Sequence, residues 1–294
     1  MHKKHWMPWA AAALSGALLE LPFPLAGPMP PWRGIFAFFA LSPLIWAILR
    51  PAEPLRRPLG RSFLLAYLCG VLWYMGNCYW IYATMKLDGG LSPVSAALLL
   101  VAFSLVLGGY FGLFGLGLAF VRRRLGLGWA LAAAPFFWVA QEIAAARITS
   151  VPWDQLGYSQ VDNALLTLLA PWTGVYGISF VLVAWNGLLI WLVLGNSRPI
   201  LRNLLLSIWI LGCGFGGSIE SAALLNGRTN PPTTATAILV QPNLDVEGNN
   251  NWPGPQWAAH IAQFTQLAGE QCKSYIAGIP QTGGACCGRR GAKD

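Results

Sequence analysis

The chain has 294 residues, of which 55% are hydrophobic and only 10% are charged, and its mean hydropathy is +0.52. Soluble domains carry about 25% charged residues, so this composition excludes an ordinary soluble protein and favours a polytopic membrane protein. The net charge is +8, and the six cysteines lack the CxxC spacing of a metal or redox site. We therefore predict neither a metal site nor a cofactor.

Seven stretches are long and apolar enough to suggest membrane helices, which need about 20 mostly apolar residues. They lie near residues 7–23, 34–49, 62–82, 94–121, 129–146, 174–195 and 200–218. Together they predict a mainly α-helical membrane domain over residues 1–219. Lys3 and Lys4 before the first stretch resemble the start of a signal peptide, but six further stretches follow, so we interpret the first as a retained helix.

Three glycines, Gly108, Gly112 and Gly115, recur on one face of the fourth stretch. Small residues at this spacing let two membrane helices approach closely. We therefore predict a tightly packed neighbouring helix at this face rather than a lipid-binding groove.

Successive stretches that cross a membrane have their ends on alternating sides, and basic residues are unequally divided between the two sides. One set carries eleven, namely Lys3, Lys4, Arg50, Arg56, Arg57, Arg61, Arg122, Arg123, Arg124, Arg198 and Arg202. The other set carries three, namely Arg33, Lys86 and Arg147. Basic loops stay on the cytoplasmic side, so we expect a cytoplasmic N-terminus and an external position for residues after the seventh stretch. Membrane topology, rather than nucleic-acid binding, then explains the positive charge.

The loop over residues 147–173 differs from the others because it mixes aromatic and polar side chains. It carries Trp153, Asp154, Tyr158, Gln160 and Asp162. Glu142 lies just before this loop, near the external end of the fifth stretch, and Arg147 follows five residues later. An acid at membrane depth is costly and usually pairs with a partner or serves a site. Two interpretations stay open: a polar floor beneath an external active site, and a Glu142–Arg147 contact that fixes the end of the helix.

The stretches offer few groups for self-contained chemistry or ion transport. The sequence contains no GxSxG, HExxH or GxxxxGK[ST] motif. Glu20 and Glu142 are the acids within the stretches, and both are near expected external ends. An ion-coupled carrier would be expected to place ionisable groups at mid-span, so this pattern counts against a transporter.

A second, more polar region follows the seven stretches. We predict a linker over residues 220–234. The apolar run Ala237–Val240 predicts a buried strand that ends at Pro242 and Asn243. A polar loop containing Trp252 and an amphipathic pattern over residues 257–270 come next. Strand, loop and helix are typical of the start of an α/β layer, which we assign to residues 235–281. Residues 282–294 change abruptly to Gly, Cys and Arg, which we interpret as a frameshift or truncation.

Several short motifs occur in an order that is similar to the apolipoprotein N-acyltransferase family. They are Gly76–Ile81, Pro152-Trp153, Gly157–Gln160, Gly174–Phe180 with Asn186, and Val240–Asn243. The resemblance covers residues 1 to about 280. One position departs from it: the family commonly has an Arg three residues after the acid of the fifth stretch, where this chain has Ala145, and Arg147 could take its place.

The resemblance implies a nitrilase-like α-β-β-α domain on the external face of the bacterial inner membrane. In that domain, a Glu–Lys–Cys triad takes an acyl chain from a phospholipid as a Cys thioester and passes it to the diacylglyceryl-cysteine amine of an apolipoprotein. The Trp-Pro-Glu motif that carries the family's Glu does not occur here, and Cys286 and Cys287 lie too early to be the nucleophile. The resemblance therefore implies no catalytic residue in this chain, and we expect the polypeptide to be inactive by itself.

The remaining expectations concern substrate contacts and partners. From the loop and the end of the fifth stretch, the candidates for the floor of the site or for substrate contact are Glu142, Arg147, Trp153 and Tyr158, and the resemblance adds Trp252. The expected partners are a phospholipid acyl donor, a diacylated apolipoprotein acceptor and the membrane, with no nucleic acid and with the protein as a monomer. The alternative function is that of a non-enzymatic membrane protein that binds lipid or lipoprotein.

Overall fold

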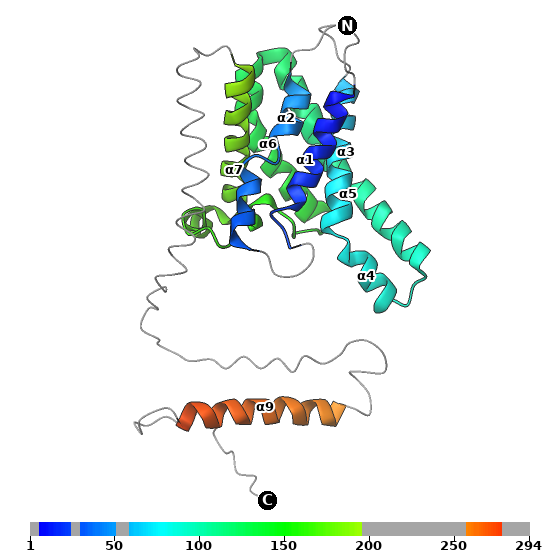
Figure 1. Ribbon diagram of the computed structural model, residues 1–294, viewed down its shortest axis with the longest axis vertical. Coiled ribbons are helices and arrows are strands. Elements are labelled where there is room, and N and C mark those ends of the chain that lie inside the picture. The colour runs from blue at the N-terminus through cyan, green and yellow to red at the C-terminus, as the bar shows by residue number, and fades with distance from the viewer. Residues whose placement is uncertain (1–5, 25–29, 51–58, 196–256, 278–294) are drawn as a thin grey trace, which may run out of the picture. The chain divides into compact units, whose positions relative to one another are not determined.

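The computed structural model describes residues 6–24, 30–50, 59–195 and 257–277. The chain divides into two compact units, Met1–Arg228 and Thr229–Asp294. The described part of the first unit is a bundle of α-helices, and the described residues contain no β-strand. The helices are α1 (Met7–Glu20), α2 (Ser42–Leu49), α3 (Leu59–Asn77), α4 (Trp80–Leu87), α5 (Pro93–Leu125), α6 (Leu127–Ile148) and α7 (Ala170–Leu194). The 3-10 helices are η1 (Pro31–Phe38), η2 (Leu156–Gln160) and η3 (Leu166–Leu169) (Figure 1).

Five helical segments are long and apolar enough to cross a membrane. They are Trp32–Leu49, Leu59–Asn77, Pro93–Leu125, Leu127–Ile148 and Leu166–Leu194. These segments confirm five of the seven predicted stretches and the mainly helical membrane fold. The first predicted stretch forms α1, whose 14 residues span about 21 Å and so fall short of a hydrocarbon core of about 30 Å. The seventh, residues 200–218, lies outside the described residues.

Two prolines explain why α1 is shorter than the predicted stretch of residues 7–23. Pro22 and Pro24 follow the last helical residue, Glu20. A residue that precedes proline is disfavoured in helical backbone, and proline itself donates no backbone hydrogen bond. The apolar pattern of the sequence continues to Phe23, whereas the helix ends three residues earlier.

The predicted stretch of residues 62–82 is divided between two helices. Helix α3 ends at Asn77, and the separate helix α4 contains no buried residue. Helix α5 follows with 33 residues, or about 50 Å. In Figure 1, α4 and the first turns of α5 project away from the other helices of the bundle. This projection begins at the α3–α4 break.

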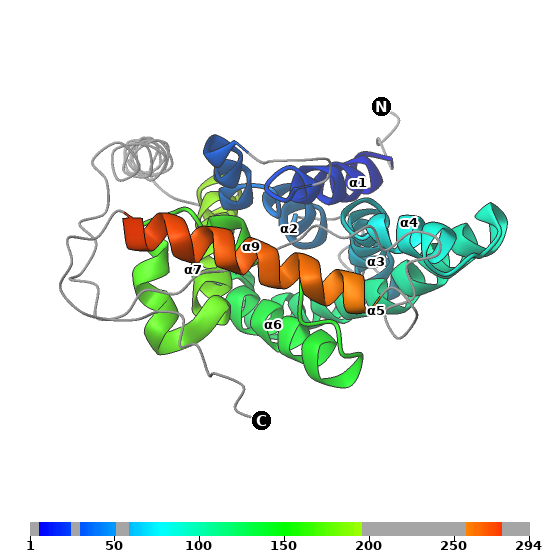
Figure 2. The ribbon, with the colours of Figure 1, turned by 90° about the horizontal axis from the view of Figure 1, so that it is seen from below.

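Helix α2 lies in the interior of the bundle. Six of its eight residues are buried, and the view from below in Figure 2 places it among α1, α3 and α7. Asn186 of α7 fixes its start by accepting hydrogen bonds from the Leu41 amide at 3.0 Å and the Ser42 hydroxyl at 2.9 Å. The same side chain donates to the carbonyl oxygens of Ala37 and Leu182. One buried amide therefore joins η1, α2 and α7.

The glycine face of α5 packs directly against α3, as the sequence predicts. A Cβ atom at Gly108 would lie 2.6 Å from the Val71 side chain, and one at Gly115 would lie 2.5 Å from the Ser62 carbonyl oxygen. Real Cβ atoms essentially never approach so closely. The absence of side chains therefore sets how near α3 and α5 lie.

The second unit contributes one described helix, α9 (Trp257–Ala277). This confirms the helix predicted over residues 257–270, and the observed helix is seven residues longer. The predicted strand at Ala237–Val240, the linker and the tail from residue 282 lie outside the described residues.

We predict that Gly115→Ala lowers the free energy of unfolding by about 1–3 kcal/mol, because the added methyl group collides with backbone of α3 that cannot rotate away. Thermal unfolding of the protein in detergent, followed by circular dichroism, measures the effect. The control is Gly109→Ala on the same helix, where a Cβ would meet nothing within 4 Å, and it should be neutral or slightly stabilising. Equal behaviour of the two variants would contradict the close packing.

Candidate functional site

The loop between α6 and α7 is folded back onto the bundle. The Val151 amide donates to the Ala145 carbonyl oxygen at 3.2 Å, and Ser150 and Asp154 adopt positive φ angles of 56° and 71°. Such angles are uncommon for residues other than glycine, and Asn and Asp tolerate them best. Four polar side chains of the loop are buried, those of Gln155, Ser159, Gln160 and Asn163. The segment is thus a packed part of the bundle.

Glu142 holds this loop to α6. Its Oε1 atom accepts a hydrogen bond from Trp138 Nε1 at 2.8 Å and another from the Leu156 amide at 2.8 Å. Glu142 is only 6% exposed and Trp138 only 1%. A buried carboxylate needs such donors because it has lost its hydration. The contact therefore fixes the start of η2 on the buried side of α6.

The second carboxylate oxygen of Glu142, Oε2, does not receive the two hydrogen bonds that Oε1 accepts. Oε2 is buried and has no hydrogen-bond partner among the described residues, although the Ser179 hydroxyl interacts with the carboxylate. Ser179 Oγ itself accepts a hydrogen bond from the Gly157 amide at 2.9 Å. Ser179 thus links the Gly157 amide to the Glu142 carboxylate.

The proposed Glu142–Arg147 contact is not found in the described structure. The hydrogen bonds of Glu142 go to Trp138 and Leu156, and Arg147 is exposed near the end of α6. The end of α6 is stabilised instead by Thr149, whose hydroxyl donates to the Ala145 carbonyl oxygen at 2.7 Å.

Further contacts join the loop to η1 and α7. Gln160 Nε2 donates to the Gly34 carbonyl oxygen at 2.8 Å, and Asn163 Nδ2 donates to Gln160 Oε1 at 3.0 Å. A Cβ atom at Gly157 would lie 2.4 Å from the Val175 carbonyl oxygen, so only glycine fits there. The Gly157–Gln160 motif therefore has a packing role that its sequence did not reveal.

A second junction links the loop to the break between α3 and α4. The Cys78 thiol donates to Asp154 Oδ2 at 3.0 Å, and the rings of Trp80 and Trp153 meet edge to face with centroids 5.9 Å apart. Burial raises the pKa of Asp154 from its ordinary value of 3.8 to about 6. Burial and the Asp154 carboxylate also raise the pKa of the Cys78 thiol. A thiol held protonated is a poor nucleophile, so Cys78 is a structural hydrogen-bond donor.

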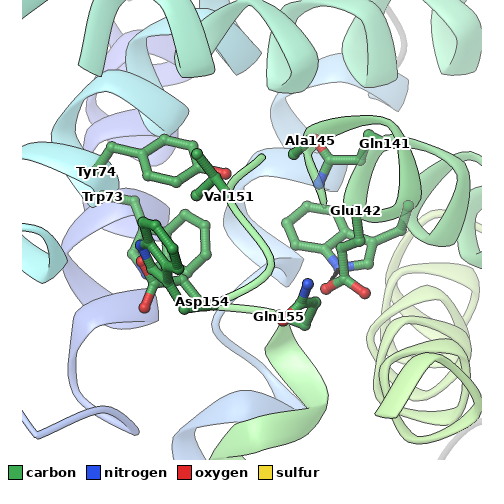
Figure 3. A pocket seen from close by; sticks show the side chains of 10 residues that line it. Trp73, Tyr74, Gln141, Glu142, Ala145, Val151, Asp154 and Gln155 are labelled. Carbon is green, nitrogen blue, oxygen red and sulfur yellow. Dashed lines mark hydrogen bonds between the residues drawn. The ribbon is translucent and has the colours of Figure 1, made fainter. Parts of the chain in front are cut away.

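A small pocket lies between these two junctions, with room for about one water molecule. Side chains of α3, α6 and the loop line it (Figure 3), including Trp73, Tyr74, Gln141, Glu142, Trp153, Asp154 and Gln155. Two of the candidate residues from the sequence, Glu142 and Trp153, are in this lining, whereas Arg147 and Tyr158 are not. Trp252 lies outside the described residues.

Sequence reasoning missed the contributions of α3 and of two glutamines to this pocket. Trp73 comes from an apolar stretch, and Gln141 and Gln155 are the sequence neighbours of the acids Glu142 and Asp154. The polar Gln141–Glu142 pair inside an otherwise apolar stretch was the available signal. Among the described residues, no three His, Cys, Asp or Glu side chains gather in a group that could hold a metal ion.

Comparison with known proteins identifies the family. The family model described as the apolipoprotein N-acyltransferase N-terminal domain matches residues 15–188, which include α2 to α6, the loop and most of α7. The chain belongs to the apolipoprotein N-acyltransferase family. Glu142, Gly157–Gln160 and Asn186 all lie within the part of the chain that matches the family.

Relatives from several bacteria agree with this assignment. The chain is 32% identical over 238 residues to the apolipoprotein N-acyltransferase of Geobacter metallireducens, covering 74% of this chain and 42% of that one. It is 28% identical over 261 residues to that of Vibrio cholerae, covering 88% and 48%. It is 36% identical over 201 residues to that of Pseudomonas putida, covering 66% and 38%. The chain thus spans less than half the length of these curated relatives.

We predict that Glu142→Leu lowers the free energy of unfolding by about 3 kcal/mol, because Trp138 Nε1 and the Leu156 amide lose their acceptor while remaining buried. Glu142→Gln keeps an acceptor oxygen of the same size and should lose less. Thermal unfolding in detergent compares the two variants. Equal losses would show that the hydrogen bonds of Glu142 do not hold the loop.

We also predict a pH dependence that originates at Asp154. Its pKa is higher in the folded protein than in the unfolded chain, so the folded state binds a proton more tightly between about pH 4 and 6. Stability is therefore greatest at low pH and declines by up to about 3 kcal/mol as the pH rises through that range. Asp154→Asn, which tolerates the same positive φ, should remove this component of the slope.

The pH profile of unfolding, taken as the difference between the wild type and Asp154→Asn, measures this effect. Asp162→Asn is the matched control, because Asp162 lies in the same loop and is exposed. Identical profiles for the wild type and Asp154→Asn would contradict the prediction.

Proposed function

We propose that this chain supplies the membrane domain of an enzyme that transfers an acyl chain from a membrane phospholipid to the N-terminal diacylglyceryl-cysteine of apolipoproteins. The observation that carries the proposal is the family match over residues 15–188, which coincides with the helical bundle and its packed loop. The relatives are named as apolipoprotein N-acyltransferases, which supports this function over non-enzymatic lipid binding.

The chemistry implied by the family proceeds in two transfers through a cysteine of a nitrilase-like domain. A thiolate, formed by a carboxylate base, attacks the phospholipid ester and releases a lysophospholipid that takes up the proton. The lipoprotein amine then attacks the thioester, which gives an amide and returns the thiol. Splitting the reaction in this way replaces one difficult step with two easier ones, and a lysine stabilises the oxyanion of each.

The helical bundle of this chain is proposed to hold the catalytic domain at the membrane surface and to take no part in making or breaking bonds. The Trp-Pro-Glu motif is absent from the 294 residues, so this polypeptide by itself is proposed to transfer no acyl chain. Residues 235–281 are proposed to begin the nitrilase-like domain. Both substrates are anchored in lipid, so a bundle that holds this domain at the membrane surface lets them arrive by lateral diffusion.

We propose that the bundle lies in the bacterial inner membrane with a cytoplasmic N-terminus. The distribution of basic residues supports this orientation, including Arg122, Arg123 and Arg124 in the last turn of α5. The loop between α6 and α7 and residues 235–281 then both lie on the external side. We propose that the protein acts as a monomer.

A chimera tests the proposal most sharply. Residues 1–243 are joined to the part of the Geobacter metallireducens relative that follows its matching position, and N-acylation of a diacylated lipopeptide is measured by mass spectrometry. We expect product from the chimera and none from the 294-residue chain, because only the chimera contains a triad. Product from the 294-residue chain, or none from a chimera that inserts and folds, would contradict the proposal.

A further inference from the structure

Arginines gather at the end of the bundle where α2 ends and α3 begins. Arg50 directly follows α2, and Arg61 lies in the first turn of α3. The start of α3 lies beside α5, because a Cβ atom at Gly115 would be 2.5 Å from the Ser62 carbonyl oxygen. The last turn of α5 adds three basic residues, namely Arg122, Arg123 and Arg124. Figure 1 shows this end of the bundle at the top, where α1 begins.

Negative charge is scarce at this end of the bundle. In the part of the bundle that the structure describes, the acids lie toward the opposite ends of the helices, and they are Glu20, Asp88, Glu142, Asp154 and Asp162. In the sequence, residues 50–61 carry four arginines and one glutamate. The arginine end of the bundle therefore has a net positive charge that attracts an anion.

Arg50 has a hydrogen-bond donor that the protein leaves unused. Its Nε atom is buried and has no hydrogen-bond partner among the described residues, and its guanidinium group lies over the Trp46 ring, 4.9 Å from the centroid. Burial and then the positive charge of Arg61 lower the pKa of Arg50, so the two guanidinium groups lie within electrostatic range of each other. Buried polar atoms are usually satisfied. An anion beside both arginines would accept the unused N–H group and offset their repulsion.

The position of Arg61 points to the same requirement. Positive charge is favourable in the last turn of a helix and unfavourable in the first turn, because the helix dipole has its positive end at the N-terminus. The dipole therefore explains the three arginines at the end of α5, but it opposes Arg61 at the start of α3. A bound anion would reverse the sign of this interaction.

The shape of the guanidinium groups and the surface of α3 indicate the kind of anion. Arginine presents a planar fork of N–H donors that matches the oxygens of a phosphate group. Leu64 follows Arg61 by three residues, so it lies on the same face of α3, and its side chain is 50% exposed. Helix α3 is itself long and apolar enough to cross a membrane. A phosphate at Arg61 thus lies above an apolar surface that suits an acyl chain.

Exposed aromatic residues place the arginines at the depth of lipid head groups. Trp6 precedes α1 and is 62% exposed, and Trp129 lies in the first turn of α6 and is 66% exposed. Exposed tryptophans are enriched at the boundary between membrane and water. The phosphate of a membrane lipid is therefore the anion closest to hand.

We propose that Arg50 and Arg61 bind the phosphate of a net-anionic phospholipid, which remains bound as a structural part of the bundle. The site is at the opposite end of the bundle from the loop between α6 and α7, so this lipid is separate from the acyl donor. Basic pockets between membrane helices on the cytoplasmic side bind anionic head groups, and the proposed orientation puts the site on that side. Binding itself depends on neither the orientation nor the acyl transfer.

Native mass spectrometry of the complete 294-residue chain in a neutral detergent tests the site. Phosphatidylglycerol is compared with phosphatidylethanolamine and phosphatidylcholine of equal acyl chains. We expect phosphatidylglycerol to bind about tenfold more tightly or better, because two arginines attract its net charge while the other two lipids are zwitterionic. Equal binding of the three lipids by the wild type would overturn the site, whether or not any variant folds.

Substitutions locate the site. Arg50→Gln and Arg61→Gln should each weaken the binding of phosphatidylglycerol by about tenfold or more, because each removes charged hydrogen bonds to the phosphate. Arg123→Gln is the matched control, because Arg123 lies at the same end of the bundle and is exposed. It should bind as the wild type does. Equal losses in all three variants would reveal a diffuse basic surface and overturn the site, as would full binding by folded Arg50→Gln and Arg61→Gln.

Thermal unfolding distinguishes a lipid phosphate from free phosphate. A ligand that binds only the folded state raises the unfolding temperature. We expect phosphatidylglycerol to raise it in the wild type and to raise it less in Arg61→Gln. Inorganic phosphate at the same concentration and constant ionic strength should have no such effect. Equal stabilisation by both ligands would overturn the assignment to a lipid.

The chimera that carries residues 1–243 separates this site from the proposed function. An active chimera combined with no preference for phosphatidylglycerol would refute the lipid site alone. A preference for phosphatidylglycerol combined with an inactive, correctly folded chimera would refute the proposed function and leave the site in place.

Discussion

The buried carboxylate of Glu142 is the constraint on which the rest of the site depends. It takes two donors on one oxygen, from Trp138 on its own helix and from the Leu156 amide of the loop. Hydrogen bonds to a charged group contribute about 1.5–3 kcal/mol each, and both donor residues are buried, since Trp138 is 1% and Leu156 0% exposed. Fixing Leu156 also fixes the next residue, Gly157, against Ser179 of α7. One acidic side chain thus sets where the loop enters η2.

The bundle beneath this contact is built to be rigid. Trp138 packs edge to face against Phe111 and Phe114 of α5, with centroids 5.1 and 5.2 Å away, and α5 in turn lies against α3 through its glycine face. The Cys78–Asp154 contact ties the end of α3 to the same loop. A loop held from α3, α6 and α7 keeps its buried polar groups in fixed positions, which a binding pocket requires.

The sequence predicted the features that depend on local pattern. Five membrane helices followed from hydropathy and the α3–α5 packing followed from glycine spacing. The cost of placing an acid at membrane depth indicated that Glu142 has a partner or serves a site. The features that it did not predict depend on distant contacts, such as the break after Asn77 and the burial of Gln155. The predicted Glu142–Arg147 contact is not formed, because side chains meet on a helix at three or four residues apart and not at five.

Amide hydrogen exchange over residues 155–160 tests the central role of Glu142 most directly. In the wild type, the Leu156 and Gly157 amides are bonded to buried acceptors, so the account predicts slow exchange there. In Glu142→Leu, exchange of this segment should become at least tenfold faster, while amides of α3 and α5 keep their protection. Unchanged slow exchange of residues 155–160 in a folded Glu142→Leu variant would contradict the account.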